Sequence, residues 1–229
     1  MRDCSCVCPG PSPEVVSFSG EFSDSYLALH PDGSRLYFQS DRPIDPAESA
    51  YEYNLWYAER EGEGWGEAKS MGRPINGRNH TGGASVTRDG TLYFTIMDLD
   101  SGASQIYRSR YLSGAYKEPE MLPEAINSHF QTCDSYVAPD ESYLIFTAFE
   151  RQEHEDDGGL FVSFRTEEGG WSSARALGPE INSEDQFGSA TISPDGRYLF
   201  FPRFNNAEEM GLDIYWVDSA LLGDLKEVG

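Results

Sequence analysis

The chain has 229 residues, and its 39 aspartates and glutamates against 17 lysines and arginines give a formal net charge of −22 at pH 7. A surface this acidic repels phosphate groups, so nucleic-acid binding is not expected. No apolar run approaches the 18 residues that a membrane-spanning helix needs, so membrane insertion is not expected either. The 23 glycines and 13 prolines predict many short elements, and the 13% aromatic content is enough for a packed core.

Residues 1–11 are predicted to form a disordered tail that carries three alternating cysteines, Cys4, Cys6 and Cys8. The tail has no apolar stretch, so this chain shows no signal peptide. Alternating thiolates can bind a soft metal, but a structural zinc site normally needs a second pair of ligands, which does not follow here. The remaining cysteine, Cys133, is interpreted as a small apolar residue of the interior.

From residue 21 onward the chain repeats itself. Four tight-turn signals are centred on aspartates that lie 57, 51 and 55 residues apart, namely Asp32, Asp89, Asp140 and Asp195. The aspartate can accept hydrogen bonds from the turn backbone, and a glycine after it in three turns supplies a positive φ. Apolar and aromatic runs of strand length surround each turn. The first run after each turn comprises residues 36–38, 92–94, 144–146 and 199–201. A second run follows in each repeat, at residues 55–58, 106–109, 160–163 and 214–217.

The first three repeats also end alike. An aromatic residue after a glycine-containing turn (Trp65, Tyr116 or Trp171) precedes a closing segment that ends in Ile-Asn. The closing segments are residues 71–76, 122–127 and 177–182. The fourth repeat stops before this segment. The repeats are therefore approximately residues 21–76, 77–127, 128–182 and 183–229.

These repeats predict an all-β fold. A unit of up to four antiparallel strands cannot bury both faces alone, so its neighbours must stack on it. Radial repetition of such units predicts a β-propeller of about four blades, formed as one domain by residues 12–229. A five-bladed or an incomplete ring is the alternative. We expect residues 12–20 to add the outer strand that the last blade lacks and so to close the ring.

Two segments fit the signature of a known family closely. Residues 193–201 (SPDGRYLFF) and 213–218 (DIYWVD) resemble the repeats of bacterial WD40-like, or TolB-type, β-propellers. Residues 171–183 resemble the stretch between blades, residues 138–146 resemble a variant blade, and the resemblance covers residues 12–226. The chain looks like a short member that lacks an N-terminal blade. The resemblance implies export to a periplasm or to the cell exterior, and most members of the family are binding platforms.

Five residues are candidates for a ligand site at a mouth of the central channel. His80 and His129 both follow a closing asparagine and lead into the first strand of a unit. Asp24, Asp134 and Asp185 lie in the approaches to such strands. A ring of acids could hold a cation, a basic group or a sugar through charge-assisted hydrogen bonds. Solvent-facing histidines and loop-capping aspartates are the alternative interpretation.

Other chemical signals are weak. The sequence has no G-x-S-x-G nucleophile elbow. Asp98 and Asp100 resemble the front of a D-x-D-x-G calcium loop, but Ser109 stands where that loop has glutamate, so a turn is favoured and no cofactor is expected. We therefore expect a monomeric, non-enzymatic platform that recognises a protein, peptide or glycan. A carbohydrate-active hydrolase or lyase that uses channel-mouth carboxylates or histidines is the alternative.

Overall fold

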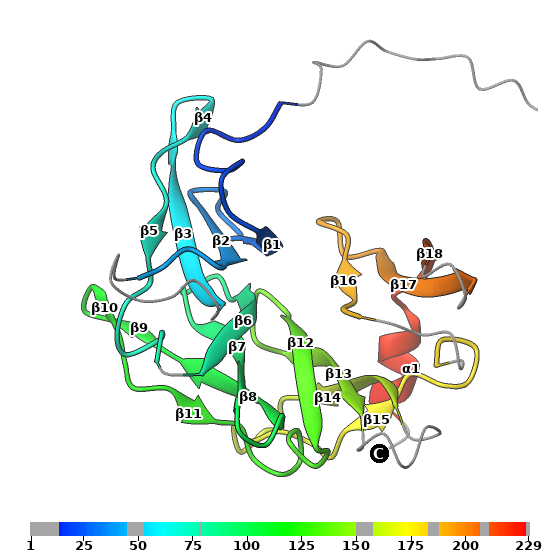
Figure 1. Cartoon of the computed structure of the whole chain (residues 1–229). Coiled ribbons are helices and arrows are strands. Elements are labelled where there is room, and N and C mark those ends of the chain that lie inside the picture. The colour runs from blue at the N-terminus through cyan, green and yellow to red at the C-terminus, as the bar shows by residue number, and fades with distance from the viewer. Residues whose placement is uncertain are drawn as a thin grey trace, which may run out of the picture.

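The computed structural model describes residues 14–44, 53–77, 79–149, 158–182, 188–206 and 211–227. Four residues named above, Cys4, Cys6, Cys8 and Asp185, lie outside these ranges. The described chain is mostly β-structure and follows the four predicted repeats, which we call units one to four (Figure 1).

Each unit is an antiparallel meander. Unit one contains β1 (Asp24–Leu29), β2 (Arg35–Ser40), β3 (Asn54–Glu61), β4 (Gly64–Trp65) and β5 (Lys69–Ser70). Unit two contains β6 (His80–Val86), β7 (Leu92–Met97), β8 (Ser104–Ser109), β9 (Tyr111–Leu112), β10 (Ala115–Tyr116) and β11 (Glu120–Met121). Unit three contains β12 (Gln131–Val137), β13 (Tyr143–Phe149), β14 (Gly159–Phe164) and β15 (Arg175–Ala176). Unit four contains β16 (Thr191–Ile192), β17 (Tyr198–Asn206), β18 (Gly211–Asp218) and the helix α1 (Leu221–Glu227).

The turn aspartates act as the sequence predicts. Each accepts a hydrogen bond at 2.8 to 3.2 Å from the backbone N–H two residues later. The residue after the aspartate has a positive φ in all four turns, including the third, where Glu141 replaces glycine with φ 61°. The bonds run to Asp32, Asp89, Asp140 and Asp195 from Ser34, Thr91, Ser142 and Arg197, respectively.

Stacking of neighbouring units builds the core. Each of the three buried apolar clusters draws side chains from two consecutive units, as the propeller prediction requires. Between units one and two, for example, Tyr37 and Leu55 pack with Val86 and Phe94. Units two and three are further joined into one sheet by a parallel bridge between Ser104 and Gln131.

The N-terminal segment differs from its prediction. The described residues of this segment, 14–20, form no strand and contact unit one rather than unit four. The Ser17 hydroxyl donates to the Trp65 carbonyl at 2.8 Å, and the ring of Phe18 stacks on Phe38 at 4.8 Å between centroids. Arg42 donates to the Phe18 carbonyl, which fixes the segment against unit one.

The four units follow an arc, with unit one (blue to cyan) and unit four (orange) at its two ends (Figure 1). In units one to three a short outer strand, β5, β11 or β15, pairs with β3, β8 or β14. Among the described residues no strand pairs with the outer edge of β18. The helix α1 has seven residues, and no described helix is long and apolar enough to cross a membrane.

Candidate functional site

The first strands of units one, two and three share an irregularity. Each has a β-bulge at which one residue adopts a left-handed conformation, with φ between 50° and 56°. These residues are Tyr26 in β1, Gly83 in β6 and Asp134 in β12, and each lies six positions before the turn aspartate of its unit. Strand β6 contacts both β1 and β12. We call Tyr26, Gly83, Asp134 and the adjacent Cys133 and Thr95 the bulge site.

Gly83 allows the backbone of β6 to approach Asp134 closely. A Cβ atom on Gly83 would lie 3.1 Å from Oδ1 of Asp134 and 3.3 Å from Oγ1 of Thr95, which is tighter than ordinary contact. Its φ of 56° is also a conformation that side-chain-bearing residues rarely adopt. At the adjacent Gly82, the side chain of Gln39 occupies the space that a Cβ would need. The two adjacent glycines thus allow Gln39 of unit one and Asp134 of unit three to lie close to the backbone of β6.

The electrostatics of the bulge site centre on Asp134. Burial raises the pKa of its carboxyl to about 6. The charge of Asp134, together with burial and Cys133, raises the pKa of Tyr26 to about 12, so its hydroxyl stays protonated at neutral pH. Burial, with Asp134 nearby, also raises the pKa of the Cys133 thiol, as expected for an unreactive cysteine.

The carboxylate of Asp134 has no hydrogen-bond or ion-pair partner among the described side chains and backbone groups. The buried hydroxyl of Thr95 likewise lacks a partner within the described part of the chain. At pH 7 a carboxyl with a pKa near 6 is mostly ionised and can accept hydrogen bonds from an ammonium, guanidinium or hydroxyl group. The bulge site therefore presents an acceptor in Asp134 and a donor in Tyr26.

Asp24 is engaged elsewhere. Its carboxylate forms an ion pair with Arg42 at 2.6 Å, and the side chains of both residues are 8% exposed. The guanidinium lies 5.1 to 5.7 Å from the ring centroids of Phe22, Phe38 and Trp56. Asp24 pairs across the strand with Ser40, two positions before the bulge, so it is not equivalent to Asp134. The pair is a structural element of unit one.

The two histidines do not occupy equivalent positions, which corrects the sequence interpretation. His80 is opposite Met97, and the corresponding residue of unit three, opposite Phe149, is Gln131. His129 lies two residues earlier, with Nδ1 3.0 Å from the Ser128 hydroxyl. The two linkers are equal in length, but His80 lies four residues after Asn76, whereas His129 lies only two residues after Asn127.

The histidine rings also have different surroundings. The ring of His129 lies 5.1 Å from that of Phe161, whereas the ring of His80 meets Tyr53 edge-on at 5.7 Å. The two side chains therefore face different aromatic neighbours.

The calcium-like segment forms a turn. Oδ1 of Asp98 accepts hydrogen bonds from the backbone and hydroxyl of Ser101 at 2.8 and 2.7 Å. Oδ1 of Asp98 is therefore engaged by the turn that follows it. Within the described ranges no three histidines, cysteines, aspartates or glutamates are placed to hold a metal ion.

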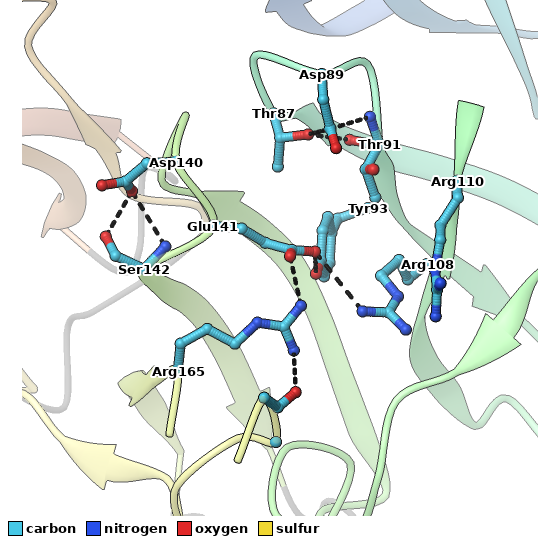
Figure 2. A network of polar contacts seen from close by, with 12 residues as sticks. Thr87, Asp89, Thr91, Tyr93, Arg108, Arg110, Asp140, Glu141, Ser142 and Arg165 are labelled. Atoms are coloured by element: carbon cyan, nitrogen blue, oxygen red, sulfur yellow. Dashed lines mark hydrogen bonds and ion pairs between the residues drawn. The ribbon is translucent and has the colours of Figure 1, made fainter. Parts of the chain in front are cut away.

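A second polar cluster joins units two and three (Figure 2). Glu141 accepts a hydrogen bond from Tyr93 and forms ion pairs with Arg165 at 2.5 Å and Arg108 at 3.7 Å. The guanidinium of Arg165 also stacks 4.4 Å from the ring centroid of Trp171. A cleft of about 310 Å³ lies beside this cluster. Arg108 also forms an ion pair with Glu120 at 2.8 Å, so both guanidinium groups face a carboxylate, and we interpret the cluster as a junction between units.

The sequence analysis singled out Asp134 but not Tyr26, Gly83 or Thr95, which the structure places beside it. The available signal was the position six residues before the turn aspartate, which holds an aromatic residue, a glycine and an acid in units one, two and three, respectively. These residue types share no chemistry, so only the register of the folded strands relates them.

Comparison of the sequence with protein-family models and with curated proteins found no match. Several solved structures are similar. TolB from Acinetobacter baumannii has a TM-score of 0.54 at 14% identity, over 85% of this chain and 40% of that chain. An alpha-L-arabinofuranosidase from Lactobacillus brevis has a TM-score of 0.56 at 14% identity, over 86% of this chain and 71% of that chain. Prolyl oligopeptidase B from Galerina marginata has a TM-score of 0.50 at 12% identity, over 90% of this chain and 28% of that chain.

These neighbours are β-propeller proteins. The likeness places this chain in the β-propeller fold class, and identities of 12 to 14% show the fold alone. The chain spans less than half the length of TolB and of the oligopeptidase.

Proposed function

We propose that the four units are blades of a TolB-type propeller and that the protein is a non-enzymatic binding platform whose ligand sits at the bulge site. The observation that carries this proposal is the carboxylate of Asp134, which is buried enough to raise its pKa yet has no partner in the described structure. Asp134 is half-buried and its carboxylate oxygens still reach solvent, so a ligand donor can approach them and form a charge-assisted hydrogen bond.

The chemistry of the bulge site favours a ligand with a cationic or hydroxyl-rich group. Asp134 can accept hydrogen bonds, and Tyr26, which is 43% exposed, can donate one from its phenol and offer its aromatic ring to a cation. The net charge of −22 concentrates cations near the surface. A basic side chain of a protein or peptide, or the hydroxyls of a glycan, would meet these requirements.

The test is binding to peptide and glycan arrays, followed by calorimetry on the best ligand. Asp134→Asn should weaken binding at least tenfold, because the amide removes the charge from the hydrogen-bond acceptor. Glu124→Gln, at an exposed glutamate with no described contact, makes the same charge change and should leave affinity unaltered. Equal affinity of the wild type and Asp134→Asn would contradict the proposal.

We also propose a monomer located in the periplasm or outside the cell, on the strength of the family resemblance. Sedimentation velocity measures the oligomeric state, and fractionation of the source cells with immunodetection measures the location. A stable dimer or a purely cytoplasmic signal would contradict these two statements.

A carbohydrate-active hydrolase or lyase is the second candidate, and one observation favours it. A carboxyl with its pKa raised to about 6 suits a general acid at neutral pH. Glycoside hydrolysis needs a second carboxylate at a defined separation, and Asp24 is held by Arg42. Release of reducing sugar from a polysaccharide panel, abolished by Asp134→Asn, would support this function over simple binding.

A further inference from the structure

The outer edge of unit four differs from those of the other three units. In each of units one to three the third strand, β3, β8 or β14, is covered by two residues of a short outer strand. The covered residues include Trp56, Tyr107 and Phe161, which also pair with the second strand of their unit. The matching residue of β18 is Tyr215, opposite Phe201, and no described strand lies on its outer side.

The closing asparagine makes a second, more specific contact in each of those units. Its side-chain amide accepts from the backbone N–H and donates to the backbone C=O of one strand residue, at 2.8 to 2.9 Å. The three pairs are Asn76 with Leu55, Asn127 with Ile106, and Asn182 with Leu160.

The residue of unit four that matches these strand residues is Ile214. Across the ladder it faces Pro202, which has no N–H, so the backbone N–H and C=O of Ile214 point to the outer edge. The described residues supply no asparagine and no other backbone partner for these two groups.

The side chains at this edge are also uncovered. Leu55, Ile106 and Leu160 are each 0% exposed, because the closing isoleucine and the next unit pack over them. Ile214 is 78% exposed, and Trp216 beside it is 61% exposed. An edge strand with apolar side chains and free hydrogen-bonding groups is a template for another strand.

We propose that the outer edge of β18 binds, from a partner molecule, an extended segment with the chemistry of this chain's own closing segments. The occupant supplies a two-residue strand opposite Tyr215 and Trp216, an apolar residue and an isoleucine that cover Ile214, and an asparagine that clamps its backbone. Three internal copies specify this occupant. The described closing segments are engaged within their own units, and residues 1–13 contain no Ile-Asn, so neither a second copy nor the tail matches it.

The experiment uses the full chain and a fluorescent peptide with the sequence of residues 174–183 (ARALGPEINS). Fluorescence anisotropy should show saturable binding, and the peptide carrying Asn182→Ala should bind at least tenfold more weakly. Hydrogen exchange should slow at the outward-facing amides of Ile214 and Trp216. Equal binding of the two peptides, or no binding at millimolar concentration, would overturn the proposal.

Two protein variants locate the contact. Ile214→Pro removes the outward N–H without touching the β17–β18 ladder, which an edge strand tolerates, and should abolish binding. If that variant fails to fold, Ile214→Lys places a charge at the covered position and should weaken binding at least tenfold. Unchanged peptide binding by a folded variant would overturn the proposal. Self-association of the protein through this edge, if the peptide does not compete with it, would also overturn the proposal. Asp134→Asn should not alter peptide affinity, which separates this proposal from the function of the bulge site.

Discussion

The side-chain amide of Asn127 makes two hydrogen bonds, both 2.9 Å long, with the backbone N–H and C=O of Ile106. It thereby does for one residue what a neighbouring strand would do, and a third bond to the Leu122 carbonyl fixes it to its own segment. The same arrangement in units one and three explains why the closing segments end in asparagine. Aspartate lacks the donor, and an apolar residue would leave the backbone N–H of the strand residue unpaired.

Asn127→Ala should lower the free energy of unfolding by about 1–3 kcal/mol, because it leaves the backbone N–H of Ile106 without a protein partner. The C=O of Ile106 keeps its hydrogen bond from the backbone N–H of Leu122 at 3.0 Å. Urea denaturation followed by tryptophan fluorescence measures the change. Asn127→Asp can still accept from the N–H but cannot donate, and it adds a charge. Full stability of the alanine variant would show that water replaces the amide without cost.

Arg42→Met should lower the free energy of unfolding by about 3–5 kcal/mol, because it leaves the buried carboxylate of Asp24 without its ion-pair partner. Combining it with Asp24→Asn should recover part of the loss. Lys69→Met breaks an ion pair with Glu59 in which both side chains are well exposed, and it should change the urea midpoint little. Similar losses for Arg42→Met and Lys69→Met would contradict the importance of burial.

Glu141 combines a strained backbone with a favourable side chain. Its φ of 61° suits glycine, but its carboxylate joins Tyr93, Arg108 and Arg165. Glu141→Ala keeps the strain and loses the contacts, so it should be clearly destabilising. Glu141→Gly loses the same contacts but relieves the strain, and it should be about 1 kcal/mol more stable than Glu141→Ala. Chemical denaturation of both variants gives the difference, and the opposite order would refute the strain.

Asp134 gives the folded protein a defined pH dependence. Its pKa of about 6 lies above the ordinary value of 3.8, so the folded chain retains a proton that the unfolded chain loses between about pH 4 and pH 6. The contribution of Asp134 to the free energy of unfolding should therefore be largest below pH 4 and fall as pH rises through this window, by at most about 3 kcal/mol.

Asp134→Asn should remove that component and leave the other titrating groups in place. The stability of the variant relative to the wild type should thus increase from pH 4 to pH 7 in denaturation experiments across that range. A constant difference between the two proteins over the range would mean that the Asp134 carboxyl is not buried as described.

Local patterns predicted the turns and the units. A turn aspartate bonds to backbone two residues away, so its role is contained in a few neighbouring letters, and the structure confirms it at Asp32, Asp89, Asp140 and Asp195. The closing isoleucines are buried as the repeat implies, with Ile126 at 0% exposure. The turn aspartates and closing isoleucines could be recognised in the sequence because each unit needs the same turn hydrogen bond and the same buried residue.

The residues of the bulge site and the packing of the N-terminal segment could be seen only in the tertiary structure. Strand pairing and the bulges place Tyr26, Gly83 and Asp134 at equivalent positions, whereas Asp24 and the two histidines lie at other positions of their units. Residues 14–20 pack on unit one because Phe18 contacts Phe38 and Arg42 there. These contacts join separate segments of the chain, so no local sequence pattern predicts them. The sequence alone thus determined the composition of each unit, through short-range hydrogen bonds and strand periodicity. The contacts between side chains of different units depend on the register of the paired strands and on the stacking of the units, and only the folded chain defines these.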